Sequence, residues 1–308
     1  MLVIKGGLSR EREVSLRSGT AIASGLREAG FEVLELDLKE DIIKEILDAV
    51  TKFKPDVAFI ALHGRIGEDG KPQAIFECLG IPYAGAGVLG SAIGLNKLIT
   101  KEIFVANDIP TPEYVVYRER DDIFDYQDLE YPVIVKPWEE GSSIGMGIAY
   151  NFIELQEIVK DSIKYDNVLI IEKYYKGREL TVGVIGNREP LLLPIIEIVP
   201  LKDFFNYEAK YTKGFTEYKV PAVIDKDVER EIYFYSKKIY EILECRGMGR
   251  IDLILTDNKK PLFLEINTIP GFTETSLLPK AALKAGISFK DLVSRIVEYA
   301  LEENKARK

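Results

Sequence analysis

The sequence predicts an α/β fold that begins with a doubly wound parallel sheet. Short apolar runs that suit buried strands alternate with amphipathic helical patterns, in the order 2–5, 14–29, 31–36, 42–53 and 57–62. Strands that alternate with helices form a parallel sheet covered on both faces, which binds its ligands at the carboxyl ends of its strands. Glu11, just before the first helix, and His63, just after the third strand, are both expected at that edge.

Length and composition point to a multidomain globular protein. A chain of 308 residues is longer than a single hydrophobic core usually supports, so two or three domains are expected. Its composition, 46% hydrophobic and 30% charged, is ordinary for a soluble globular protein. We predict an N-terminal domain over 1–95, a central domain over 96–177 and a C-terminal domain over 178–308. The net charge of −9 argues against a general nucleic-acid binder. With neither a signal peptide nor an apolar run of about 20 residues, we expect a cytoplasmic protein without a membrane partner.

Neither residue at the N-terminal sheet edge identifies a function by itself. A single carboxylate at a helix start, such as Glu11, is usually explained by the helix dipole. His63, the only histidine, lies in the glycine-rich segment HGRIGEDG, and a structural role and a functional role are about equally plausible. The dinucleotide pattern G-x-G-x-x-G is absent after the first strand, which disfavours an NAD dehydrogenase.

The middle of the chain carries a second glycine-rich segment. A helix is expected over 97–106, and strands over 113–117, 132–136 and 148–150. The glycine-rich loop 141–147 therefore joins two strands, unlike a Walker A loop, which opens a helix. Such a hairpin can cover nucleotide phosphates with backbone N–H groups, and Lys136 before it could reach one. The alternative is a flexible hairpin beside a solvated lysine.

The C-terminal part alternates strands and helices around a long irregular segment. We expect a helix over 155–162 and strands over 168–171, 179–186 and 191–199. Helices are expected over 225–243, 276–285 and 289–302. The segment 201–221 has no clean period and is predicted to be a functional lid loop.

Polar residues alternate with apolar ones in the segment 249–267, which predicts a β-hairpin. Closing the turn at 258 and 259 pairs Asp252 with Glu265 and Arg250 with Asn267 on one face. The other face is apolar, with Ile251, Leu253, Leu255, Leu262, Leu264 and Ile266. Two carboxylates and an amide suit Mg²⁺ shared with phosphates, and Arg250 could hold a negative charge. A structural ion network would give the same pattern.

Dispersed motifs together resemble one family. They are GGLSREREVSLRSG (6–19), HGRIGEDG (63–70), IVKPWEEGSSIGM (134–146), IEKYYKGRE (171–179), EAKY (208–211), MGRIDLIL (248–255) and EINTIPGFTETSLLP (265–279). The chain resembles the D-alanine–D-alanine ligases of the ATP-grasp superfamily over nearly its whole length. Lys5 in the first strand and Trp138 after Lys136 depart from the usual family residues, and Lys5 puts the packing of that strand in doubt.

The resemblance implies a two-domain ATP-grasp fold after the N-terminal domain, with ATP between the two later domains. It implies that Lys97, Lys136, Ser143, Glu172, Lys173 and Glu179 bind ATP, and that Asp252, Glu265 and Asn267 hold two Mg²⁺ ions, with Mn²⁺ as an alternative. It also implies that Glu11, Ser142, Tyr211, Arg250, Gly271 and Ser276 are catalytic, and that His63, Lys210 and Leu277 bind substrate. A homodimer rests on the resemblance alone.

The implied reaction joins two D-alanines through an acyl phosphate for peptidoglycan precursor synthesis. The resemblance associates tyrosine at 211, hydrogen-bonded to Ser142, with dipeptide formation, whereas phenylalanine is found in many enzymes that make the D-alanyl-D-lactate ester. The nearest alternative is a relative within the superfamily that joins D-alanine to D-lactate or forms another carboxylate–amine bond. A non-catalytic nucleotide-binding regulator is the alternative from another class, but it predicts loss of the metal or oxyanion residues, and all of these are present.

Overall fold

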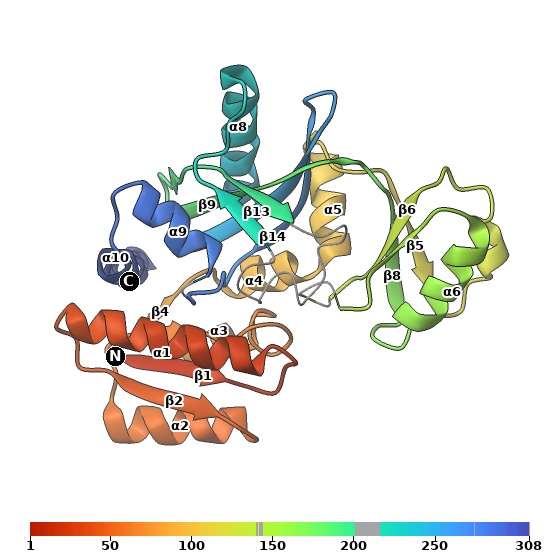
Figure 1. Cartoon of the computed structure of the whole chain (residues 1–308). Helices are drawn as coiled ribbons and strands as arrows, with labels where there is room; N and C mark the ends of the chain where they lie inside the picture. The colour runs from red at the N-terminus through yellow and green to blue at the C-terminus, as the bar shows by residue number, and fades with distance from the viewer. Residues whose placement is uncertain (140, 142–143, 201–215, 274, 308) are drawn as a thin grey trace.

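A computed structural model describes residues 1–139, 141, 144–200, 216–273 and 275–307. Three sheets follow one another along the chain, and the C-terminal helix returns to the first of them (Figure 1). Within these residues, no helix combines the length and apolar character required to span a bilayer. The domain boundaries near 95 and 177 remain predictions.

The first sheet is parallel and doubly wound, as predicted. It consists of β1 (Leu2–Gly6), β2 (Leu34–Leu38), β3 (Ala58–Ile60) and β4 (Tyr83–Ala84), in the order β2-β1-β3-β4. The helices are α1 (Arg12–Glu28), α2 (Ile42–Phe53) and α3 (Lys71–Cys78), and α1 and α2 lie on opposite sides of the sheet (Figure 1). All of β1 except Lys5 is buried, as expected for a strand covered on both faces.

Lys5 is accommodated without leaving a charge unpaired in the core. Its ammonium group donates a 2.8 Å hydrogen bond to Thr20 and forms an ion pair with Glu35. The side chain passes over Gly19, where an added Cβ would lie 2.5 Å from the Lys5 Cβ. A glycine on α1 therefore makes room for the lysine stem, which answers the packing question raised by the sequence.

Two helices connect the first sheet to the rest of the chain. The predicted helix α5 (Lys97–Ala106) is confirmed, but the small-residue segment before it also forms a helix, α4 (Val88–Leu95), which the sequence did not predict. Glycines in α4 permit close contact, since a Cβ on Gly90 would lie 2.7 Å from the Leu243 carbonyl oxygen and one on Gly94 2.8 Å from Thr268 Cγ2. Small residues that look like a linker thus serve helix packing.

The second sheet is antiparallel and lies at the right of Figure 1. Its strands are β5 (Tyr114–Arg118), β6 (Val133–Pro137), β7 (Gly147–Ala149) and β8 (Val168–Lys173), in the order β5-β8-β6-β7. A short 3-10 helix, η1 (Ile123–Tyr126), and α6 (Phe152–Ser162) accompany it. The carbonyl of Trp138 accepts a 3.0 Å bond from the Lys97 N–H, which joins this sheet to the start of α5.

The third sheet contains the predicted hairpin. The strands are β9 (Gly177–Gly186), β10 (Leu191–Leu192), β11 (Ile196–Pro200), β12 (Thr216–Lys219), β13 (Gly247–Thr256) and β14 (Pro261–Asn267). Their order in the sheet is β12-β11-β9-β13-β14, with β10 beside β9. The helices that follow or cover it are α8 (Lys226–Ile242), α9 (Leu277–Lys284) and α10 (Phe289–Arg307), and α10 packs on α1 and β4.

Two sequence predictions for this sheet were wrong. The single strand predicted over 191–199 is interrupted between β10 and β11, where Pro194 has no N–H for a ladder hydrogen bond. The predicted loop 201–221 includes a strand near its end, since β12 pairs antiparallel with β11. The lid assignment otherwise concerns residues 201–215, which lie outside the described residues.

The hairpin register matches the prediction at its functional end but not near its turn. Asp252 pairs with Glu265 and Arg250 with Asn267, but a β-bulge then shifts the register so that Leu253 faces Phe263. The turn has an extra residue, with Lys259 at φ 59°, and the bulge at Leu264 compensates for it. Phe263, fully buried, therefore takes the core position predicted for Leu264.

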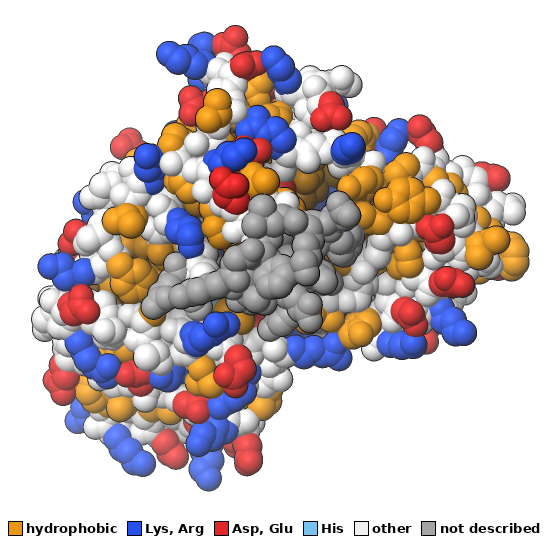
Figure 2. Space-filling model, in the orientation of Figure 1, with side chains coloured by type: hydrophobic (Ala, Val, Ile, Leu, Met, Phe, Trp, Pro, Cys, Tyr) orange, Lys and Arg blue, Asp and Glu red, His pale blue; other side chains and the backbone are white. Residues whose placement is uncertain are grey.

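Charges of both signs are distributed over the molecular face in Figure 2. Lysine, arginine and acidic side chains alternate across the N-terminal part, whereas hydrophobic side chains group over the second sheet.

Candidate active site

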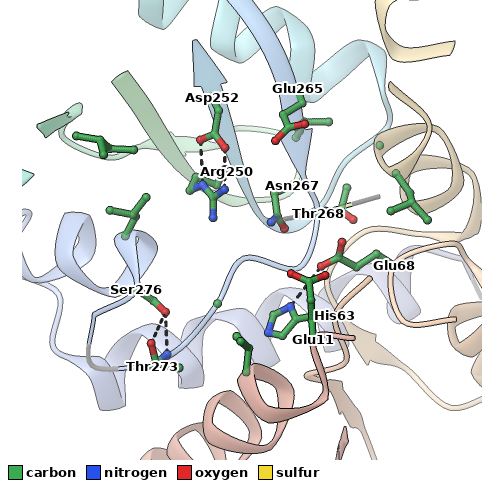
Figure 3. A pocket seen from close by; sticks show the side chains of 18 of the residues that line it. Glu11, His63, Glu68, Arg250, Asp252, Glu265, Asn267, Thr268, Thr273 and Ser276 are labelled. Atoms are coloured by element: carbon green, nitrogen blue, oxygen red, sulfur yellow. Dashed lines mark hydrogen bonds and ion pairs between the residues drawn. The ribbon is translucent and has the colours of Figure 1, made fainter. Parts of the chain in front are cut away.

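A pocket of about 140 Å³ lies between the carboxyl edge of the first sheet and the β13–β14 hairpin (Figure 3). Its lining includes residues predicted for four different roles, ATP binding, metal binding, catalysis and substrate binding: Glu11, His63, Lys97, Glu179, Arg250, Asp252, Glu265, Asn267, Gly271, Ser276 and Leu277. They come from segments up to about 260 positions apart, so the fold brings the dispersed motifs to one place.

The polar face of the hairpin is one wall of this pocket. The Arg250 guanidinium donates two bonds to the Asp252 carboxylate, at 2.9 and 2.7 Å, and the Thr181 hydroxyl on β9 donates a third at 2.5 Å. Lys97, at the start of α5, lies 3.4 Å from Glu265. The ion network considered as an alternative for the hairpin therefore exists, and it borders an open pocket.

The charge and the donor set of the pocket fit divalent cations. Five carboxylates line it, those of Glu11, Glu68, Glu179, Asp252 and Glu265, against the two cationic groups of Lys97 and Arg250. Among the described residues, no three His, Cys, Asp or Glu side chains cluster as a metal site of their own. Two carboxylates and an amide would therefore hold Mg²⁺ together with oxygens of a bound phosphate, as this hard cation commonly does.

Glu11 is enclosed by glycines of two other segments. Its position is just before α1, and its side chain makes no helix-capping bond. A Cβ on Gly64 would lie 2.9 Å from Glu11 Oε2, and one on Gly141, at the start of the glycine-rich loop, 3.0 Å. These glycines allow two backbones to approach a carboxylate that faces the pocket.

His63 is buried and bonded on both ring nitrogens. Its Nδ1 lies 3.3 Å from Glu68 and its Nε2 3.3 Å from the Ser18 hydroxyl, and Figure 3 shows the Glu68 contact. Burial raises the pKa of the Glu68 carboxyl, and nearby Glu11 adds to the rise, although His63 opposes it. The single histidine is therefore part of a buried polar group at the pocket wall.

The segment after β14 forms another wall. The Ser276 hydroxyl, at the N-cap of α9, accepts a 2.9 Å bond from the Thr273 N–H. A Cβ on Gly271 would lie 2.8 Å from this hydroxyl, so only glycine fits without displacing Ser276. The turn thereby brings a backbone segment and a hydroxyl close to the side of the pocket opposite the hairpin.

Three residues predicted to bind ATP lie outside this pocket lining. Glu172 on β8 is buried between Lys136, at 2.8 Å, and Lys101, at 3.2 Å. Burial alone would raise the pKa of Glu172, but Lys136 and Lys101 outweigh it and lower that pKa. Lys173 turns outward and donates a 2.7 Å bond to Glu130.

Four further predicted residues, Ser142, Ser143, Lys210 and Tyr211, lie outside the described residues. Conversely, the structure adds Glu68, Thr273 and Lys101, which the sequence did not single out. Glu68 had a signal, since it lies five positions after His63 in the same glycine-rich segment. Lys101 had none, because a lysine within a helix is most often solvated.

Comparisons with known proteins identify the family of this chain. Residues 39–86 match the family model described as D-ala D-ala ligase N-terminus, and residues 103–298 match D-ala D-ala ligase C-terminus. The D-alanine–D-alanine ligase of Carboxydothermus hydrogenoformans is 42% identical, with 97% of each chain covered. The chain belongs to the D-alanine–D-alanine ligase family.

Other members of the D-alanine–D-alanine ligase family are similarly close. The ligase of Syntrophobacter fumaroxidans is 44% identical over 98% of this chain and 97% of its own. The solved structure of the Bacillus anthracis ligase complexed with ATP has a TM-score of 0.86 and 33% identity, and covers 100% of this chain and 98% of its own. The family, the fold class and the ligase activity predicted from the sequence are confirmed.

Proposed function

We propose that this pocket binds ATP and two D-alanines and joins the amino acids into D-alanyl-D-alanine through an acyl phosphate. The observation that carries the proposal is that the hairpin face with Arg250, Asp252, Glu265 and Asn267 lies across one pocket from Glu11. A phosphate-handling face and an ammonium-binding carboxylate are the two requirements of an ATP-dependent amino-acid ligase.

The first D-alanine would bind with its ammonium group at Glu11. Its carboxylate oxygen would then attack the γ-phosphorus of ATP in line, so that the new O–P bond forms as the bond to ADP breaks. Lys97, 3.4 Å from Glu265, would neutralise a transferring phosphate. Asp252, Glu265 and Asn267 would hold the Mg²⁺ ions, which when bound neutralise phosphate charge during transfer.

The second step would form the C–N bond. The amine of the second D-alanine would attack the acyl-phosphate carbonyl, and the C–O bond to phosphate would break as the C–N bond forms, with the amine proton passing to the departing inorganic phosphate. Arg250 and the Gly271 N–H would stabilise the oxyanion, at about 3–4 kcal/mol per donor in comparable sites. Ser276 and Leu277, at the start of α9, would position the second amino acid, and His63 would border the first.

The nucleotide would lie beside the buried cluster of Lys101, Glu172 and Lys136. One carboxylate between two ammonium groups leaves this cluster with a net positive charge, which suits a polyphosphate ligand. We propose that Lys136 contacts phosphate, Glu172 and Lys173 the adenine side, and Glu179 the ribose. Ser142, Ser143, Lys210 and Tyr211, on segments outside the described residues, are proposed to complete the site.

A direct assay tests the function. Purified full-length chain is incubated with ATP, Mg²⁺ and a panel of D- and L-amino acids and D-lactate, and phosphate release and product mass are measured. We expect release that depends on D-alanine, with one phosphate per dipeptide. Turnover only with another acceptor would make the chain a different carboxylate–amine or ester ligase. ATP binding without turnover would make it a non-catalytic regulator.

We further propose that the protein is a cytoplasmic homodimer that supplies a peptidoglycan precursor and accepts Mn²⁺ in place of Mg²⁺. Light scattering of the purified chain tests the dimer, and the same phosphate assay with each metal tests the substitution. A monomer at micromolar concentration would contradict the first of these, and activity with Mg²⁺ alone the second.

A further inference from the structure

Ser18 connects two walls of the pocket from behind. It is a fully buried residue of α1, two turns after Glu11, and is not part of the pocket lining. Its hydroxyl oxygen accepts a 3.1 Å bond from the Phe272 N–H and lies 3.3 Å from His63 Nε2. A Cβ on Gly271 would come within 4.0 Å of the same oxygen. One hydroxyl group thus contacts both the histidine and the turn that carries Gly271.

Every hydrogen-bond donor among Ser18, His63 and Phe272 has an acceptor in only one arrangement of the hydrogens. The Phe272 N–H can only donate, so the Ser18 oxygen accepts from it. Among the described residues, the only other hydrogen-bonding partner of that oxygen is His63 Nε2, so the hydroxyl hydrogen points there. Nε2 must then be unprotonated, and Nδ1 carries the hydrogen that is donated to Glu68.

The opposite arrangement leaves a buried donor without a partner. With hydrogen on Nε2, the ring would donate to the Ser18 oxygen, which already accepts from Phe272, and the serine hydrogen would have no acceptor among the described residues. Buried donors without partners are strongly disfavoured in folded proteins. A positively charged imidazole would create the same problem.

We propose that Ser18 is a positioning residue that fixes His63 as the neutral Nδ1–H tautomer and holds the Gly271 turn against α1. The Nε2 lone pair is occupied by the serine hydroxyl, so His63 shapes the first subsite and does not take the proton of the attacking amine. Through the Phe272 N–H, Ser18 sets the position of the neighbouring Gly271 N–H. The ammonium-binding helix and the oxyanion turn are therefore held in one geometry.

The tautomer can be measured directly because the chain contains one histidine. In ¹⁵N-labelled full-length protein near neutral pH, long-range ¹H–¹⁵N correlations of a single imidazole separate the three protonation forms. We expect a protonated Nδ1 and an unprotonated Nε2. A protonated Nε2 would overturn the proposal. This measurement does not depend on the proposed function, so an inactive protein would still give the answer.

Serine 15 provides a matched control on the same helix. It is equally buried, accepts a 2.8 Å bond from the Gly6 N–H and donates a 2.6 Å bond to the Ala61 carbonyl. Ser15→Ala and Ser18→Ala therefore each remove one bond accepted from a backbone N–H and one bond donated by the hydroxyl, but only Ser18→Ala removes contacts with His63 and Phe272.

For Ser18→Ala we expect the Nε2 resonance to move to higher frequency as it loses its hydrogen bond. We also expect kcat for dipeptide formation to fall roughly 10- to 100-fold, with the KM for ATP kept. Ser15→Ala should leave the imidazole resonances and kcat near wild type. The kinetic part rests on the proposed function. An unmoved Nε2 resonance in Ser18→Ala, or equal kinetic losses in both variants, would overturn the positioning role. If Ser18→Ala does not fold, the His63 tautomer measured in the wild-type protein tests the proposal by itself.

Discussion

Replacing Lys101 with methionine is expected to destabilise the second sheet and its junction with α5. Lys101 is fully buried, lies 3.2 Å from Glu172 and donates a 2.7 Å bond to the Thr111 hydroxyl. Methionine has a similar length and apolar stem, so the change removes the charge and leaves packing nearly intact. Glu172 would then have only Lys136 to compensate its charge.

The size of the loss in unfolding free energy follows from the burial of the Lys101–Glu172 ion pair. Removing one partner of a buried ion pair typically costs about 3–5 kcal/mol, because the remaining charge is left uncompensated. Lys136 still neutralises part of the Glu172 charge, which reduces this to about 2 kcal/mol. Loss of the bond to Thr111 adds about 1 kcal/mol. We expect a decrease in the free energy of unfolding of about 3 kcal/mol near neutral pH.

The decrease should depend on pH in a defined direction. In the wild type, the folded-state pKa of Glu172 is lowered, so its contribution is present above the unfolded pKa of about 4.3 and is lost as pH falls through the folded pKa. In Lys101→Met, the effect of burial on Glu172 is expected to exceed that of the remaining Lys136 and to raise the folded-state pKa of Glu172. The free energy of unfolding of this variant therefore falls as pH rises through the range in which the carboxyl ionises. The difference between the two proteins should therefore widen from about pH 4 to pH 7.

Urea unfolding followed by tryptophan fluorescence measures the effect. Trp138 is the only tryptophan and follows Lys136 by two residues, so it reports on this sheet. The double variant Lys101→Met/Glu172→Gln removes both charges and should be less destabilised than the sum of the single variants. A loss below about 1 kcal/mol for Lys101→Met, together with additive single effects, would refute the coupling.

Three further substitutions test the pocket. Glu265→Gln should lower ATP turnover roughly 100-fold or more, with little change in stability, because it removes a charge proposed to hold metal. Gly271→Ala should lower kcat roughly tenfold, since its Cβ would lie 2.8 Å from the Ser276 hydroxyl and displace the proposed oxyanion donor. Tyr211→Phe should raise the D-lactate to D-alanine product ratio, most clearly below neutral pH, where the competing amine is protonated; the hydroxyl bond to Ser142 that the family resemblance implies would contribute about 1 kcal/mol.

Each of these three predictions can be contradicted by one result, and Glu265→Gln has a control variant. Asp225→Asn removes an exposed carboxylate that pairs with Lys259 at the far end of the same hairpin, and should leave turnover unchanged. Near-normal turnover of Glu265→Gln would remove the hairpin from the chemistry. Wild-type kcat in Gly271→Ala would argue against the turn as oxyanion donor, and a constant product ratio in Tyr211→Phe would show that this tyrosine does not select the acceptor.

Local sequence patterns were sufficient to predict those features of the fold that depend on residues near one another in the chain. Alternation along 249–267 determined that Asp252 faces Glu265 and Arg250 faces Asn267, because side chains on paired strands share a face. The strand–helix alternation of the first 62 residues likewise determined the parallel sheet, and with it the edge where Glu11 and His63 lie. The bulge at Leu264 was not predictable, because it compensates for a turn one residue longer than the pattern suggested.

Only the tertiary structure determined which groups far apart in the sequence form an ion pair or a hydrogen bond. Glu172 and Lys101 are 71 positions apart, and Ser18 and Phe272 are 254 positions apart, so nothing in the local sequence links either pair. A lysine or a serine on a helix is usually solvated, and it becomes buried only when another segment covers it. Burial then makes a hydrogen-bond or ion-pair partner obligatory, since an uncompensated polar group costs more inside the protein than in water.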